Sequence, residues 1–203
     1  MTASITRCCK SIRRSFVRGW LLLAAALLLG VLSSAHAAEV DIRNAALDAA
    51  EDGGYVLTAD LRFDLPPRIS EAISRGVTMV FVLDIEIERP RWLWFNERRA
   101  SRQIVWRLSY HALTRQYRLS TGALYRNFNS LDDALIAMKR IRAWPVIDRG
   151  VLKAQENYEA SLRFHVDLSE LPKPLQVNAI ASRDWNLSSD TLTWVFLATG
   201  TTQ

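Results

Sequence analysis

Three carboxylates at alternate positions of residues 77–88 are the strongest candidate for chemistry in this sequence. Asp84, Glu86 and Glu88 alternate with apolar residues, so on a β-strand they share one face at a spacing of about 6.6–6.8 Å. Such a row could bind Ca²⁺, or supply the two carboxyl groups of a glycosidase, which lie about 5–9.5 Å apart. The competing interpretation is a solvated sheet face whose carboxylates pair with arginine from the next strand. We favour this second interpretation and expect Arg107 to face Asp84 or Glu86.

Few other residues carry chemistry. His111 and His165 fall on the polar phase of predicted strands, and neither has a histidine or cysteine at metal-ligand spacing. The cysteines, Cys8 and Cys9, both precede the apolar run near the N-terminus. The sequence contains no nucleophile elbow, phosphate-binding glycine loop or HExxH motif. It therefore predicts no catalytic residue, metal site or cofactor, and we expect a protein that is not an enzyme.

Residues 89–99, RPRWLWFNERR, are a candidate binding surface because four arginines and three aromatics stand there against one glutamate. Pro90 tends to end a strand and Asn96 suits a turn, so the stretch is predicted to connect the two strands of a hairpin. The aromatic side chains alternate between the two sides of an extended chain, so they cannot all fold onto the core. The candidate interaction surface comprises Arg91, Trp92, Trp94, Phe95, Arg98 and Arg99.

Three interpretations of this surface stay open. Arginine beside exposed aromatics is typical of protein interfaces, and a similar mixture suits a membrane interface. The partner is then an envelope protein or an anionic membrane surface. Alternatively, the tryptophans only close one end of the sheet. High salt should release a lipid-bound form because it screens charge, whereas a contact anchored by tryptophan should survive it.

The first 37 residues have the parts of a secretory signal peptide. Five basic residues and no acid precede the apolar run WLLLAAALLLGVL, and Ala35-His36-Ala37 supplies small residues for cleavage. We expect residues 38–203 to form one periplasmic domain, anchored through residues 19–35 where the leader is not cleaved. The chain has 26 basic and 21 acidic residues, so removing five basic residues leaves a neutral domain. A neutral exported domain is not expected to bind nucleic acid.

Alternation of apolar and polar residues dominates the domain and predicts antiparallel strands packed on one core. A helix is expected over residues 67–75, with proline in its first turn and Gly76 behind it. A second helix should open on a cap at Ser130 and end before Pro145. The predicted fold class is mainly β, an antiparallel sandwich or open barrel with two short-to-medium helices packed on it. The expected strands cover residues 41–47, 55–63, 77–88, 104–111, 117–120, 158–168, 175–180 and 191–197.

Five segments follow one another in the domain, with a Trp-bearing connection after the first: LPPRISEAISRGVTMVFVLDIEIE, IVWRLSYHALTRQYRLS, FNSLDDALIAMKRI, YEASLRFHVDLSELPKPLQV and DWNLSS. In this order the chain resembles an exported proteobacterial family grouped as domain of unknown function 4390. The resemblance covers nearly the whole domain and implies no activity for any residue. Genes of that family often lie beside those of a sensor kinase and its response regulator, which implies a role near extracytoplasmic signalling.

Two functional hypotheses follow. The first is a non-enzymatic envelope interaction domain, associated with a sensor kinase, that contacts its partner through the candidate interaction surface. The second is a carrier of an apolar or lipid ligand in an open β-barrel. The first requires a filled core and the second a deep apolar cavity. An envelope hydrolase that uses the three carboxylates is the least favoured, because it would need them in a concave cleft.

Overall fold

Most of the predicted strands are present, and they belong to one sheet. The structure, a computed structural model, describes residues 39–91 and 96–199, all within the compact unit Ala37–Gln203. Three of its strands, β6, β7 and the two-residue β9, were not predicted. The strands are β1 (Glu39–Ala49), β2 (Tyr55–Arg62), β3 (Met79–Arg89), β4 (Glu97–His111), β5 (Gln116–Thr121), β6 (Leu124–Phe128), β7 (Arg140–Ile147), β8 (Asn157–Asp167), β9 (Ser188–Ser189) and β10 (Leu192–Leu197).

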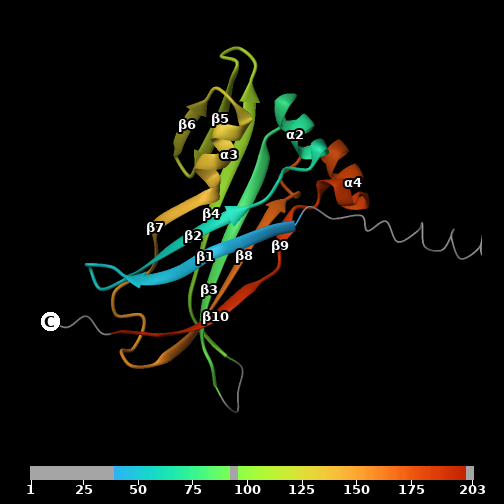
Figure 1. Ribbon diagram of the computed structural model, residues 1–203. Coiled ribbons are helices and arrows are strands. Elements are labelled where there is room, and N and C mark those ends of the chain that lie inside the picture. Colours follow the sequence, from blue (N-terminus) through green and yellow to red (C-terminus); the bar gives the residue numbers. More distant parts are fainter. Residues whose placement is uncertain (1–38, 92–95, 200–203) are drawn as a thin grey trace, which may run out of the picture. The chain divides into compact units, whose positions relative to one another are not determined.

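The sheet runs in the order β6-β5-β4-β3-β8-β9-β1-β2-β7, and β10 pairs with β8 (Figure 1). Neighbouring strands are antiparallel except β1 and β9, which are parallel. β3 and β4 form the longest hairpin, and β3 is also flanked by β8 on its other edge. The sheet curls into an open half-barrel, which confirms the predicted mainly β class.

The inner face of the sheet is filled with side chains. The ring of Phe164 on β8 stacks on Phe63 at 5.2 Å, and lies 6.1 Å from Phe81 and 6.5 Å from Trp106. Burying each large apolar side chain stabilises the fold by about 1.5–3 kcal/mol, so this cluster holds the two halves of the curled sheet together. Aliphatic residues with at most 1% exposure surround the aromatic cluster: Leu57, Leu83, Ile85, Ile87 and Leu162.

Two helices lie where the sequence predicted them. Pro67 stands in the first turn of α2, and Gly76 follows its end at φ +87, where a residue with a side chain is strained. α3 opens on Ser130, whose Oγ accepts a hydrogen bond from the Asp133 N–H at 3.1 Å and donates one to Asp133 Oδ2 at 2.6 Å. The described helices are α2 (Pro67–Ser74), α3 (Leu131–Lys139), α4 (Lys173–Ala181) and the 3-10 turn η1 (Arg183–Trp185). None of them combines the length and apolar character of a membrane span.

α3 ends earlier than predicted. It was expected to continue towards Pro145, but it ends at Lys139, and Arg140 adopts an extended conformation with φ −113 and ψ 103. The chain continues directly into β7, which pairs with β2 and buries Ile141 and Ile147. β7 is the last strand of the described sheet, so Pro145 is tolerated on its outer edge. Tertiary pairing has overridden the helical pattern here.

The predicted strand at residues 175–180 is wrong, because this segment belongs to helix α4. Pro172 stands at the N-cap of α4 and Pro174 in its first turn, which is the usual place for proline in a helix. Ala179 is buried, and Leu175, one helical turn earlier, packs against the core. α2, α4 and η1 gather at the same end of the sheet (Figure 1).

Candidate functional site

The three carboxylates of β3 share the outer face of the sheet and have polar neighbours. Glu86 pairs with Arg98 of β4, whose Nη2 lies 3.2 Å from Glu86 Oε1. Asn96 Nδ2 donates a hydrogen bond to Glu88 Oε2 at 3.2 Å. In the part of the chain that the structure describes, no three histidine, cysteine or acidic side chains are grouped so as to hold a metal ion. The row has the arrangement of a solvated sheet face.

Arg107 does not pair with this row, so that prediction was wrong. It lies on the same face as Asp84, but the β3–β4 register places Arg107 opposite Val80 and Gln103 opposite Asp84. Bringing Arg107 opposite Asp84 would require β4 to slip by four residues along β3. The alternation of apolar and polar residues excludes odd shifts of register, but a shift by four residues keeps the same face, so the connection and the bulge decide between such registers.

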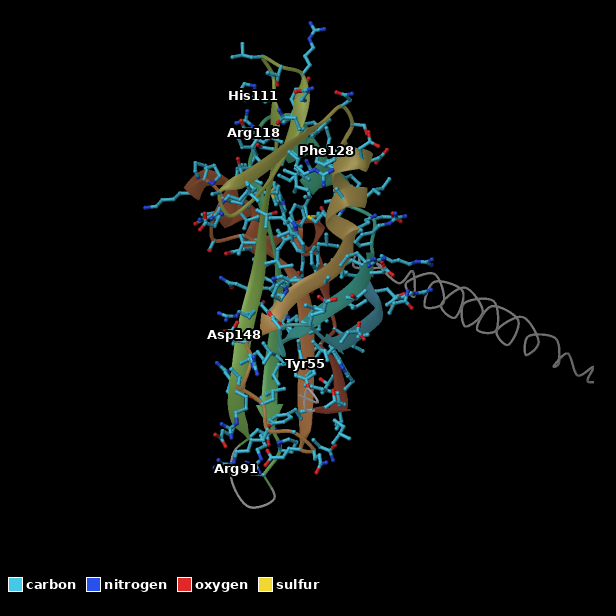
Figure 2. All side chains as sticks on the ribbon, turned by 90° about the vertical axis from the view of Figure 1, so that its left-hand side faces the viewer. Tyr55, Arg91, His111, Arg118, Phe128 and Asp148 are labelled. Atoms are coloured by element: carbon cyan, nitrogen blue, oxygen red, sulfur yellow. The ribbon has the colours of Figure 1, made fainter. Side chains whose placement is uncertain are left out.

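Each of the two histidine rings has a polar side chain close to it. His165 of β8 places Nδ1 3.3 Å from Asp84 Oδ2, in an orientation that makes no hydrogen bond. His111 lies at the end of β4 that is far from the hairpin connection (Figure 2), and its Nδ1 is 3.4 Å from Thr114 Oγ1. Neither contact assembles a nucleophile with a base and its orienting group, the arrangement that covalent catalysis uses.

The candidate interaction surface maps to the end of the β3–β4 hairpin at which β3 ends and β4 begins. The chain leaves the sheet there at Arg91 (Figure 2). The described residues there, 86–91 and 96–99, together with Glu156, which pairs with Arg89, are called the hairpin end below. Trp92, Trp94 and Phe95 lie outside the described residues. Of the three arginines of the predicted surface, Arg91 and Arg99 share Glu97, whereas Arg98 pairs with Glu86.

Each arginine of the hairpin end is paired with a carboxylate. Glu97 contacts two of them, and Arg99 Nη1 lies 3.1 Å from Glu97 Oε1. Arg89 donates from Nη2 to Glu156 Oε1, just before β8, at 2.9 Å. With Glu88 included, four arginines stand against four glutamates, so the formal charge is zero. The pairs are Arg89–Glu156, Arg91–Glu97, Arg98–Glu86 and Arg99–Glu97.

The remaining arginines of residues 89–126 lie on β4, β5 and β6 and in the turn between β4 and β5. Arg102 Nη2 lies 2.7 Å from the carboxylate of Asp148, which follows β7. The guanidinium of Arg118 lies 4.8 Å from the ring centre of Tyr125, and that of Arg126 lies over the next aromatic residue of β6 at 5.1 Å. Successive residues of a strand point to opposite faces. The dense run of arginine in the sequence is therefore not one basic surface.

The sequence analysis missed a second cationic group. A cleft of about 510 Å³ lies on the outer face of β1, β2 and β7, beside the end of α3. Its residues come from distant parts of the chain, and only their place on the polar phase of two predicted strands hinted at a shared face. This basic cleft is lined mainly by Arg43, Asn44, Asp60, Arg62, Lys139, Arg140 and Arg142.

Comparison with known proteins identifies a family and no activity. A family model described as "Domain of unknown function (DUF4390)" matches residues 37–195, in agreement with the resemblance seen in the sequence. No curated protein and no solved structure matches the chain. The chemistry of the two surfaces is therefore the basis on which a function can be argued.

Proposed function

The chain belongs to the DUF4390 family, and we propose that it is a non-enzymatic interaction domain of the cell envelope. In this proposal it binds another protein through the hairpin end and the connection that the hairpin carries. The leader-like N-terminus and the family resemblance favour a periplasmic location. An envelope sensor kinase is the first partner to test, because the resemblance implies a role near such kinases.

The charge balance of the hairpin end supports a protein partner over an anionic membrane. A free arginine near an anionic bilayer contributes about 1 kcal/mol to binding. At the hairpin end four glutamates offset the four arginines, so the field that would attract anionic lipid is small. The same ion pairs connect β3, β4 and the start of β8, and they orient the side chains before a partner arrives. Such preorganisation lowers the entropy lost on binding.

The filled interior favours the interaction domain over the lipid carrier. A carrier needs an apolar cavity, usually of about 300–1,000 Å³. The described inner face is occupied instead by Phe164 with its three aromatic neighbours and by fully buried aliphatic side chains. A ligand could enter only by displacing this core.

Crosslinking in cells tests the proposal. A photoreactive residue in place of Trp94 should yield a protein adduct, and that adduct should persist at high salt because the contact does not depend on net charge. A photoreactive residue in place of Leu113 is the matched control, since Leu113 is 92% exposed between β4 and β5. It should give no such adduct.

Two outcomes would overturn the proposal. One is the absence of a Trp94-specific protein adduct together with a Trp94→Ala strain that behaves like its parent. The other is an adduct made of lipid that high salt releases, which would assign the surface to the membrane. Native mass spectrometry of the purified protein adds a check on the carrier hypothesis, because co-purifying lipid would contradict a filled core.

A further inference from the structure

The register of β1, β2 and β7 brings arginines together on one face. Asp60 of β2 lies between Arg43 of β1 on one side and Arg140 of β7 on the other. Arg62, two residues along β2, lies on the same face and opposite Asp41. Side chains directly opposite on antiparallel strands have Cβ atoms about 4.5–5.5 Å apart. Three strands thus bring the side chains of Arg43, Arg62 and Arg140 to the face that carries Asp60.

Two irregularities of the strands turn further polar side chains towards Asp60. The register between β1 and β2 shifts where Asn44 adopts φ +52. The register between β2 and β7 shifts where Ala143 adopts φ +48. A left-handed conformation is unfavourable for alanine and is kept where the surrounding structure demands it. Bulges of this kind re-aim neighbouring side chains, and here they leave Asn44 and Arg142 bonded to Asp60.

Asp60 connects β1, β2 and β7 within the basic cleft through hydrogen bonds. Asn44 Nδ2 donates to it at 2.9 Å and Arg142 Nη2 at 2.5 Å. These hydrogen bonds, with the charges of Arg142 and Arg140, hold the pKa of Asp60 below its ordinary value of 3.8. Arg142 Nη1 also donates to two backbone carbonyls, on β2 and β7, at 3.1 and 2.7 Å. These bonds hold the guanidinium of Arg142 in place. The carboxylate of Asp60 is already bonded to Asn44 and Arg142.

The other cations give the cleft a net positive charge. Arg43 pairs with Asp41 at 2.5 Å, and Lys139 Nζ donates to a backbone carbonyl at 2.6 Å. Arg62 and Arg140 are exposed and form no ion pair with any residue that the structure describes. Five cations against two aspartates give a formal charge of +3. Like charges this close repel one another, and an anion bound between them would relieve the repulsion.

We propose that the basic cleft binds a phosphate group, held by the guanidinium groups of Arg62 and Arg140. Guanidinium forks bind phosphate oxygens through two parallel hydrogen bonds, which a lysine ammonium cannot do. Two separate arginines and a charge of +3 suit a dianionic phosphate better than a single carboxylate, which one arginine can satisfy. The phosphate is either free in solution or the headgroup of a lipid. This site is separate from the hairpin end and does not rest on the function proposed there.

Calorimetric titration with inorganic pyrophosphate tests the site, using the protein purified from the cells that produce it. We expect saturable binding that weakens as salt rises. Arg62→Gln and Arg140→Gln should each weaken it about tenfold, since each removes a charge-assisted pair of hydrogen bonds. Arg107→Gln is the matched control, because Arg107 is an exposed arginine on the outer face of another part of the sheet. It should bind pyrophosphate like the parent, and circular dichroism should show all variants folded.

Vesicles separate the two sources of phosphate. If the natural group is a lipid headgroup, phosphatidic acid vesicles should sediment with the protein, phosphatidylcholine vesicles should not, and pyrophosphate should compete. If the natural group is free, pyrophosphate should bind while both kinds of vesicle leave the protein in solution. Three results would overturn the proposal: no saturable pyrophosphate binding, an equal loss in Arg107→Gln, or tighter binding of a glutamate-rich peptide than of pyrophosphate.

Discussion

The hairpin end and the basic cleft each hold four arginines but use them differently. At the hairpin end every arginine contacts a glutamate, and the formal charge is zero. In the basic cleft Arg62 and Arg140 form no ion pair with any described residue, and the formal charge is +3. The density of arginine along a chain therefore does not predict the electrostatic field that the arginines produce. What decides the field is which strands lie opposite one another and whether they supply acids.

The largest effect should come from the core that joins the two regions. Phe164 stacks on Phe63, over whose ring the ammonium of Lys139 lies at 4.6 Å, and it also neighbours Phe81 of the long hairpin. Phe164→Ala should lower the free energy of unfolding by about 3–5 kcal/mol, because it leaves a cavity among large side chains. Urea unfolding followed by tryptophan fluorescence measures this loss. Phe164→Leu should lose clearly less. Two separate transitions in the parent would show that the regions do not share one core.

The next largest effect is expected on pyrophosphate affinity, which one double variant in each region compares directly. The double variant Arg62→Gln/Arg140→Gln should weaken pyrophosphate binding about a hundredfold, as two independent losses of about tenfold multiply. The matched double variant at the hairpin end, Arg91→Gln/Arg98→Gln, should leave that affinity within about twofold of the parent. Calorimetry gives both values. Equal losses in the two variants would mean that pyrophosphate reports only the total charge of the protein.

A smaller effect is expected from the cap of α3, the helix that carries Lys139 to the basic cleft. Ser130→Ala removes the acceptor for the Asp133 N–H and should lower the free energy of unfolding by about 1 kcal/mol. Ser130→Asp keeps an acceptor and should be close to the parent. Urea unfolding distinguishes them. Equal destabilisation by both substitutions would assign the effect to packing and not to the cap.

The basic cleft should also make stability depend on pH. Because the folded pKa of Asp60 lies below 3.8, its contribution is fully present above that value and is lost as pH falls through the folded pKa. Asp60→Asn should therefore flatten the fall of stability below about pH 4. Urea unfolding at a series of pH values measures the slope. Asp167→Asn is the comparison, because Ser169 lowers the pKa of Asp167 in a similar way. An unchanged slope in Asp60→Asn would contradict a stabilising role of the hydrogen bonds that Asn44 and Arg142 donate to Asp60.

The smallest effect is expected at the hairpin end. The Arg98–Glu86 pair is open to solvent, with side-chain exposures of 61% and 39%. A double-mutant cycle with Arg98→Ala and Glu86→Ala should give a coupling of about 0.2–1 kcal/mol. That coupling should vanish in about 1 M salt, where charges are screened within about 3 Å. A coupling above about 2 kcal/mol would mean that solvent screens this pair far less than an exposed pair.

Several parts of the fold were predictable from the sequence because their causes are local. The apolar phases of β2, β3 and β8 point to the core as alternation requires. Ser130 caps α3 through a group only three residues away. α4 was not predicted, because the apolar residues of 175–180 alternate as in a strand, whereas Pro172 and Pro174 mark the start of a helix.

The basic cleft could not be predicted from the sequence. Arg62 and Arg140 are distant in the chain, and their meeting depends on β7 forming beside β2. That pairing required α3 to end at Lys139, against the helical pattern that continues towards Pro145. The bulge at Ala143 left no signal either, because a positive φ at alanine is opposed by its own side chain.

By itself the sequence determined which residues face the core, where two helices begin, and the neutrality of the chain beyond its leader-like N-terminus. These depend on neighbours one to four positions away, which set the face of a strand or the first turn of a helix. The tertiary structure alone decided the register of β3 against β4 and the pairing of β7 with β2. These two features determine which arginines form ion pairs. Register and pairing depend on the closing of loops and the filling of one shared core, and those energies arise between residues far apart in the chain.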